Sequence, residues 1–228
     1  MTKIKICGIT KASEAAYLNE AKVDYAGFVF YEKSKRNINI EKAREIFKVL
    51  DKNITKVAVM VSPSIQTVEE LMNEDFDIFQ IHGSLSEEVI RLSGKPIWYA
   101  INIEDEKEAS DKLGMIEELP DNLNKKIEGY VVDAPKFGSG QTFNWQKSKR
   151  LKKAGTTSPP DKMFILAGGL NAENVAEGIE LFNPDVVDIS SNAEGQNGKD
   201  RALILDFVNA TRRLCKPTRT TRSYVNPK

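Results

Sequence analysis

Two side chains in this sequence could move protons on a small substrate. Cys7 ends a short segment rich in isoleucine, and Asp133 ends the run Tyr-Val-Val-Asp at residues 130–133. A thiol near helix N-termini ionises readily, because the positive end of the helix dipole stabilises the thiolate. The alternative for Cys7 is a buried, inert thiol, which is the usual state of a free cysteine. Together, Cys7 and Asp133 form a candidate acid/base pair.

Glycine and small polar residues form a candidate phosphate site. Gly168 and Gly169 lie where an expected strand runs into an expected helix, a place where bare backbone N–H groups bind anions. By themselves they could serve only to turn the chain. Ser191 and Asn192 follow the next expected strand. The two segments in this order predict phosphate binding.

Four further residues lie where they could contact a substrate. Arg36 can bind a carboxylate or a phosphate bidentately, although a lone loop arginine is more often a solvated charge. Asp188 stands near the end of the last expected strand. His82 is expected to make a structural hydrogen bond rather than act as the base. Gly140 belongs to a Gly-Ser-Gly stretch that could form a flap over the site.

The segments that carry these residues follow a repeating order. Short runs rich in Ile, Val and Phe alternate with amphipathic runs, which is typical of parallel strands joined by helices. Eight such units favour a single α/β domain, the (β/α)₈ or TIM barrel, over an open sheet, and no G-x-G-x-x-G motif follows the first strand. In this barrel the active site lies at the carboxyl ends of the strands. The expected strands are residues 3–7, 24–30, 55–61, 76–82, 96–101, 128–133, 162–167 and 185–190, and the last helix is expected at 199–213.

Helix start signals occur after three of the expected strands. Thr10 is an expected N-cap, Ser62 precedes a proline, and Ser84 with Glu87 has the spacing of a capping box. These signals predict where the first, third and fourth helices begin.

Composition excludes several classes of protein. Lys and Arg number 33 and Asp and Glu number 33, so the net charge is zero. The sequence therefore lacks the excess of positive charge that is typical of a nucleic-acid binder. No apolar run is long enough to span a bilayer, and no signal segment precedes the first strand, which predicts a soluble, cytoplasmic protein. Cys7 and Cys215 suit a reducing compartment, and the single histidine excludes a multi-histidine zinc site. We expect one domain over residues 1–215 and a polar, flexible tail over 216–228.

Six ordered motifs extend from the first expected strand to the last. They are Lys-Ile-Cys-Gly-Ile-Thr at 5–10, Gly-Phe-Val-Phe at 27–30 with Lys-Ser-Lys-Arg at 33–36, Phe-Gln-Ile-His-Gly at 79–83, Asp133 with Gly-Ser-Gly-Gln-Thr-Phe-Asn-Trp at 138–145, Leu-Ala-Gly-Gly-Leu at 166–170 and Val-Asp-Ile-Ser-Ser at 187–191. Any one of them is weak evidence, but the ordered set is specific. It resembles the N-(5′-phosphoribosyl)anthranilate isomerase family.

This resemblance implies an Amadori rearrangement of an aldosamine to a ketosamine in tryptophan biosynthesis, without metal or cofactor. It implies that Asp133 is the general acid that opens the ribose ring and that Cys7 is the general base that removes the C2′ proton. It further implies that Arg36 holds the anthranilate carboxylate and that Asp188 positions the substrate. The phosphate would bind backbone amides near Gly168, Gly169, Ser191 and Asn192, with the flap around Gly140 closing over it. The implied partner is a small phosphorylated substrate; monomer and homodimer both stay open.

The sequence departs from the usual family pattern at several positions. Asn192 stands where glycine is usual, and asparagine tolerates a left-handed backbone better than most residues. Asn144 replaces a more usual aspartate, Glu32 a frequent proline, and the loop at 137–140 differs from the common Gly-Gly-Thr-Gly. None of these changes removes a group that performs proton transfer.

Three alternatives to this isomerase function fit the residues less well. The related histidine-pathway isomerase uses an aspartate at the end of the first strand and needs a second anion site, so Cys7 argues against it. A barrel that binds phosphorylated ligands without catalysis has no physical need for a reactive thiol. A redox role for Cys7 lacks a resolving cysteine nearby, because Cys215 is expected on the last helix.

Overall fold

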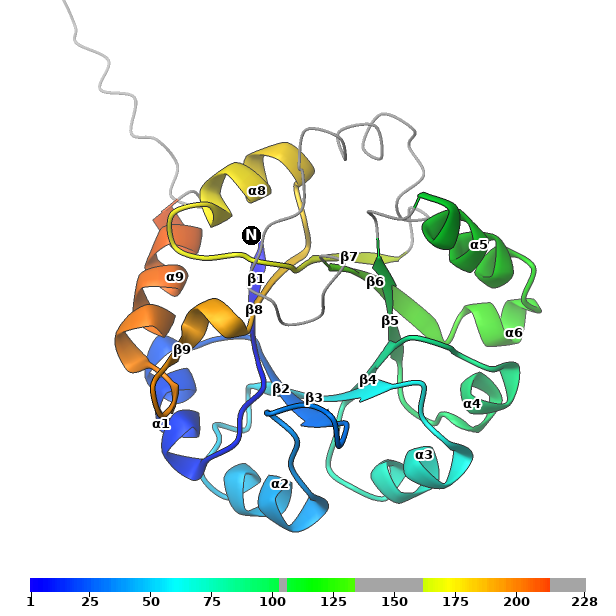
Figure 1. Cartoon of the computed structure of the whole chain (residues 1–228), viewed down its shortest axis with the longest axis horizontal. Helices are drawn as coiled ribbons and strands as arrows, with labels where there is room; N and C mark the ends of the chain where they lie inside the picture. Colours follow the sequence, from blue (N-terminus) through cyan, green and yellow to red (C-terminus); the bar gives the residue numbers. More distant parts are fainter. Residues whose placement is uncertain (103–105, 134–161, 214–228) are drawn as a thin grey trace, which may run out of the picture.

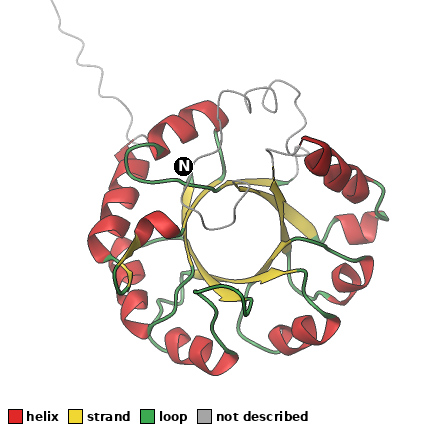
Figure 2. Cartoon of the chain, viewed as in Figure 1, coloured by secondary structure: helices red, strands yellow, loops and turns green. Residues whose placement is uncertain are grey.

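A parallel sheet of eight strands closes on itself at the centre of the protein, and helices surround it (Figures 1 and 2). The computed structural model describes residues 1–102, 106–133 and 162–213, and the side chains of Asn102, residues 106–110 and Asp133 lie outside that description. Each strand pairs with the next along the chain, and the eighth pairs with the first, which confirms the (β/α)₈ barrel. The strands are β1 (Lys3–Cys7), β2 (Tyr25–Phe30), β3 (Thr55–Val61), β4 (Ile78–His82), β5 (Ile97–Asn102), β6 (Ile127–Asp133), β7 (Met163–Leu166) and β8 (Val186–Ile189).

The helices of the described residues lie outside this ring of strands (Figure 2). After β8 the chain forms a short 3₁₀ turn, η1 (Ser191–Ala193), and a hairpin of β9 (Glu194–Gly195) and β10 (Gly198–Lys199). The last helix packs against the first, which completes the outer ring (Figure 1). The helices are α1 (Ala12–Ala21), α2 (Ile40–Phe47), α3 (Ile65–Met72), α4 (Glu87–Leu92), α5 (Glu106–Glu117), α6 (Asp121–Asn124), α8 (Val175–Phe182) and α9 (Arg201–Arg213).

Strand alternation divides the core into two layers, because successive side chains of a strand point to opposite faces. The outer layer fills the space between strands and helices with aliphatic and phenylalanine side chains. The inner layer fills the barrel; there the rings of Tyr25 and Trp98 meet edge to face, with centroids 5.0 Å apart. Cys7 belongs to this inner layer. The Cys7 side chain therefore points into the barrel at the carboxyl end of β1.

The three predicted helix starts are wrong by one or two residues. Lys11 rather than Thr10 precedes α1, and Ser64 and Ser86 cap α3 and α4 through hydrogen bonds to Thr67 N (3.1 Å) and Val89 N (3.3 Å). Each cap lies later because the residues at the end of the preceding strand are hydrogen-bonded to a neighbouring strand or loop. These hydrogen bonds keep the backbone in a non-helical conformation for one or two more residues.

Ser62 and Ser84 form one of these hydrogen bonds. Ser62 has a left-handed backbone (φ 44°), and its hydroxyl accepts a hydrogen bond from the Ser84 amide at 2.9 Å. The two residues therefore join the loops after β3 and β4 instead of starting helices.

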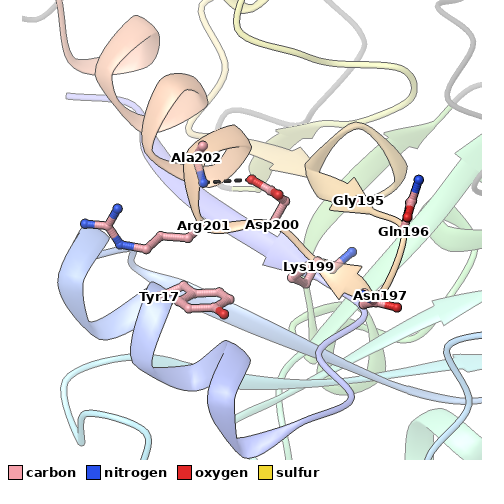
Figure 3. A pocket seen from close by; sticks show the side chains of 9 residues that line it. Tyr17, Gly195, Gln196, Asn197, Lys199, Asp200, Arg201 and Ala202 are labelled. Atoms are coloured by element: carbon pink, nitrogen blue, oxygen red, sulfur yellow. Dashed lines mark hydrogen bonds between the residues drawn. The ribbon is translucent and has the colours of Figure 1, made fainter.

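The last helix also begins later than expected. Asp200 caps α9, since its Oδ1 accepts from the amide of Ala202 at 2.8 Å (Figure 3) and from the amide of Leu203 at 3.1 Å. Lys199, expected at the helix start, belongs to β10 instead. Among the described helices, none combines the length and the apolar character needed to cross a membrane.

Candidate active site

Cys7 lies at the mouth of the barrel with a side chain that is almost fully buried. Its partner in the β1–β2 ladder is Gly27, and a Cβ added to Gly27 would stand 2.8 Å from Cys7 Sγ and 3.1 Å from Lys5 Nζ. The missing side chain at position 27 therefore makes room for both the thiol and the ammonium group. The Ser190 hydroxyl, which follows β8, donates to the Cys7 carbonyl at 3.0 Å and fixes the end of β1.

A buried ion pair lies directly beneath the thiol. Lys5 Nζ is 2.6 Å from Asp188 Oδ2, and Lys5 has no exposed surface. Asp188 Oδ1 is also buried and has no hydrogen-bond partner among the described residues. Asp188 was predicted as a site residue, whereas Lys5 was missed. The available signal was a lysine between isoleucines in a strand expected to be buried on both faces.

The pKa of the Cys7 thiol corrects the sequence-based expectation. Burial raises that pKa above its ordinary value, and the nearby Lys5 opposes the rise without cancelling it. The prediction of a lowered pKa is therefore wrong, because loss of water outweighs the nearby positive charges. Burial also opposes the charge on Lys5, but Asp188 and Cys7 outweigh it and raise the pKa of that ammonium.

His82 ends β4 inside the barrel. Its Nε2 lies 2.8 Å from Gln80 Nε2, so it makes a side-chain hydrogen bond of the structural kind expected from the sequence. Burial, with smaller effects from Lys5 and Lys112, lowers the pKa of His82 to about 3. The imidazole is therefore neutral at physiological pH.

Arg36 is held by a residue that the sequence analysis did not single out. Its guanidinium donates through Nε to Glu194 Oε1 and through Nη2 to Glu194 Oε2, the latter at 3.1 Å. Glu194 also binds Lys35 (2.7 Å) and Lys199 (3.0 Å). Burial opposes the charge of this carboxylate, but Arg36, Lys35 and Lys199 together lower the pKa of Glu194 to about 2. The loop after β2 is thereby fastened to the hairpin after β8.

The side chain of Arg36 crosses the loop after β1. Gly8 has a φ of 82°, and a Cβ added there would overlap Arg36 Cδ. Glycine is required at this position for both reasons, since other residues avoid this backbone region and a side chain would displace the arginine. Arg36 thus lies against Gly8, the residue that follows Cys7.

The two segments of the candidate phosphate site meet in the structure. Asn192 Nδ2, in η1, donates to the carbonyls of Gly169 and Leu170, each at 3.0 Å. Gly168 and Gly169 both have positive φ, 82° and 69°. Ser191 begins η1 beside them.

Two details of that site differ from expectation. The glycine pair does not open a helix directly, because Asn171 Oδ1 first accepts from the amides of Glu173 (2.8 Å) and Asn174 (3.0 Å) and α8 begins only at Val175. Asn192 does not use a left-handed backbone, because η1 is right-handed and the described residues with positive φ do not include it. Its side-chain amide bridges the two loops instead.

Asp133 and Gly140 are placed only in part. Asp133 is the last residue of β6, in register with Asn102 of β5, at the same end of the barrel as Cys7. Its side chain is not described. Gly140 and the flap predicted around it lie outside the described residues.

A pocket outside the barrel mouth lies beside the hairpin that follows β8 (Figure 3). It has a volume of about 550 Å³ and is lined by Tyr17 of α1 together with residues 195–202. It contains none of the predicted site residues. In the described part of the chain, no group of three or more His, Cys, Asp or Glu side chains is arranged to hold a metal ion.

Comparison with known proteins points to one family. A family model described as N-(5′-phosphoribosyl)anthranilate (PRA) isomerase matches residues 4–210. The isomerase of Aquifex aeolicus is 38% identical over 218 residues, which cover 93% of this chain and 99% of the relative. That of Streptococcus gordonii is 35% identical over 209 residues, covering 91% and 96%.

Solved structures agree with these relatives. The phosphoribosylanthranilate isomerase of Thermotoga maritima superposes with a TM-score of 0.78 at 28% identity, covering 93% of this chain and 100% of that one. A second structure of such an isomerase, in complex with reduced 1-(o-carboxyphenylamino)-1-deoxyribulose 5-phosphate, gives a TM-score of 0.74 at 27% identity with the same coverage. A further Thermotoga maritima structure concerns monomers of a dimeric form.

Proposed function

Because the chain belongs to the N-(5′-phosphoribosyl)anthranilate isomerase family, we propose that Cys7 and Asp133 carry out the family's rearrangement here. The reaction is an isomerisation in tryptophan biosynthesis that converts N-(5′-phosphoribosyl)anthranilate to the 1-deoxyribulose 5-phosphate derivative. The observation that carries the assignment is the position of Cys7, which belongs to the inner layer at the carboxyl end of β1 and lies close to Lys5 of the Lys5–Asp188 pair, while Arg36 lies against the next residue, Gly8.

The reaction requires two proton movements. Asp133 donates a proton to the ribose ring oxygen, the C1′–O bond breaks, and the anthranilate nitrogen forms a Schiff base with C1′. Cys7 as the thiolate removes the C2′ proton, and the resulting enolamine tautomerises to the ketone. Asp133 is the last residue of β6, in register with Asn102 of β5, so its backbone lies at the same end of the barrel as Cys7, which supports the assignment.

Arg36 keeps donors free for the anthranilate carboxylate while it is bound to Glu194. A guanidinium has five N–H groups, and Arg36 donates to Glu194 through only one on Nε and one on Nη2. No hydrogen bond joins Nη1 to another described residue, so this edge of the guanidinium can bind a second carboxylate. Glu194 fixes the plane of the guanidinium, so less side-chain entropy is lost when substrate binds.

The substrate phosphate is assigned to the loops after β7 and β8. Gly168 and Gly169 allow close approach of the backbone, and Asn192 holds the two loops together. Amides near Gly168, Gly169, Ser191 and Asn192 would donate to the phosphate oxygens, the usual arrangement in barrels that bind sugar phosphates. Asp188 and His82 line the interior below and complete the predicted substrate contacts.

The further properties that we propose are the compartment, the extent of the catalytic domain and the partner. A reduced Cys7 suits the cytoplasm. We propose that residues 1–215 are the catalytic domain and 216–228 a tail without a catalytic role. A single small phosphorylated substrate is its proposed partner, and sedimentation would decide between monomer and homodimer.

A fluorescence assay that follows consumption of phosphoribosylanthranilate made in situ tests this function. Cys7→Ser and Asp133→Asn are each expected to lose activity by at least about 10²-fold, because removing a general acid or base costs about 10²- to 10⁴-fold. Cys215→Ser is the matched control for loss of a thiol and should retain full activity. Wild-type protein that binds the reduced product analogue but turns nothing over would contradict the proposal and favour a non-catalytic binding barrel.

A further inference from the structure

Lys5 is a buried charge that the proposed reaction does not use. Its side chain has no exposed surface, and lysine is almost never buried to this extent unless it is paired. The pairing with Asp188 spans 183 residues of sequence and joins β1 to β8, where the barrel closes. Replacing such a pair with apolar side chains is often neutral or stabilising, so stability alone does not explain its presence.

The geometry puts the ammonium of Lys5 beside the thiol of Cys7. The two residues are two positions apart on β1 and therefore share its inner face. Gly27 marks where their ends lie, because an added Cβ there would be 2.8 Å from Sγ and 3.1 Å from Nζ. Gly27 is opposite Cys7 rather than Lys5 in the ladder, so the lysine side chain extends toward the catalytic end of the barrel.

We propose that Lys5 is a positioning residue that stabilises the Cys7 thiolate, while Asp188 holds Lys5 protonated. The inference rests on the proposed role of Cys7 as the general base. Lys5 keeps its proton throughout: the C2′ proton passes to Cys7 Sγ, and the ammonium only stabilises the thiolate before that transfer. Lys5 therefore lies close to Cys7 on one side and is paired with Asp188 on the other.

The charges around Cys7 favour Lys5 as the group that stabilises the thiolate. Burial raises the pKa of Cys7; Lys5 is the largest charge effect that lowers it, followed by an opposing effect of Asp188 and then by Lys199. Lys199 is already bound to Glu194 Oε1 at 3.0 Å and to the Ser190 carbonyl at 2.9 Å. Its charge is thus partly offset by Glu194, and its effect on the pKa of Cys7 is smaller than that of Lys5.

Alkylation of Cys7 by iodoacetamide as a function of pH tests this inference without substrate. A Cys215→Ser background leaves Cys7 as the sole thiol. Lys5→Met should move the pH midpoint of alkylation upward by at least one unit. At a fixed pH below the midpoint the rate should fall about threefold or more, because about tenfold less thiolate is partly offset by its greater nucleophilicity.

Two control variants separate Lys5 from other lysines. Lys3→Met removes the same charge from the exposed end of the same strand and should leave the midpoint unchanged. Lys199→Met removes the other nearby ammonium and should move the midpoint less than Lys5→Met does. A midpoint in Lys5→Met equal to that of Lys3→Met, or a larger shift in Lys199→Met, would overturn the inference.

The double variant Lys5→Met with Asp188→Asn covers the case in which Lys5→Met does not fold. It leaves no unpaired buried charge, so it should fold, and its midpoint should still rise because Lys5 acts on Cys7 more strongly than Asp188 does. An unchanged midpoint in this variant would contradict the inference. The isomerase assay is independent of this readout: an inactive wild type with the expected alkylation shifts removes the proposed function but leaves the electrostatic role of Lys5.

Discussion

Arg36 and Glu194 are 158 residues apart in sequence, yet the guanidinium donates to both oxygens of the carboxylate. Arg36 follows β2 and Glu194 follows η1, so the contact joins two loops on either side of β1 above the barrel. Both side chains are mostly buried, at 12% exposed each. A bond of this kind holds Arg36 in one orientation beside Gly8, and a substrate carboxylate needs a binding arginine with a fixed orientation.

Glu194→Gln should weaken substrate binding more than it slows turnover. The variant keeps the size of the side chain but loses a hydrogen bond to a charged partner worth about 1.5–3 kcal/mol, so we expect KM to rise about tenfold with little change in kcat. Steady-state kinetics provide the measurement. Glu20→Gln is the control, because Glu20 forms an exposed pair with Arg201 and should leave KM unchanged. Equal KM values in wild type and Glu194→Gln would remove the orienting role of Glu194.

Gly8→Ala should destabilise the barrel and disturb Arg36. The left-handed backbone at Gly8 costs alanine about 1–2 kcal/mol, and the new methyl group would overlap the arginine side chain. Chemical denaturation and KM measure the two effects. Gly114→Ala, within α5 and with nothing near the added Cβ, should instead stabilise by about 0.5–1 kcal/mol. A Gly8→Ala protein as stable as wild type would argue against the observed position of Arg36.

His82 should make the protein sensitive to mild acid. Its pKa is about 3 in the folded state against about 6.5 when unfolded, so the unfolded chain takes up a proton first as the pH falls. Its contribution to stability is complete above pH 6.5 and is lost progressively down to about pH 3. At pH 5 the loss amounts to about 2 kcal/mol. Denaturant unfolding at several pH values should show a smaller acid loss in His82→Gln, and parallel curves for the two proteins would contradict burial of a neutral imidazole.

Asn192→Ala should weaken phosphate binding. The side-chain amide donates to two carbonyls of the glycine loop after β7, and each bond contributes about 0.5–1.5 kcal/mol. We expect inhibition by inorganic phosphate to weaken about tenfold as the two loops separate. Asn73→Ala is the control, since its amide donates to Glu69 O on the exposed surface of α3. An unchanged inhibition constant would place the phosphate away from these loops.

Much of the fold follows from local sequence pattern. Strands β1 and β3 have the expected boundaries, and both contain the Ile or Val residues that a buried strand requires. The count of eight βα units predicts closure of the sheet. The helix starts were less predictable, since Ser62 and Ser84 meet the rules for caps but bond to each other across loops.

The sequence by itself determined the barrel, the identity of the motifs and the end of the barrel at which Cys7, Arg36 and Asp133 lie. Only the tertiary structure decided how these groups are charged and held. The Lys5–Asp188 pair exists because β8 closes against β1, and the anchoring of Arg36 exists because a hairpin after β8 reaches over the first loop. Burial then raises the pKa of Cys7 where helix dipoles alone had suggested a lower one. Such effects depend on distance and exclusion of water, which residues far apart in sequence acquire only when the barrel closes.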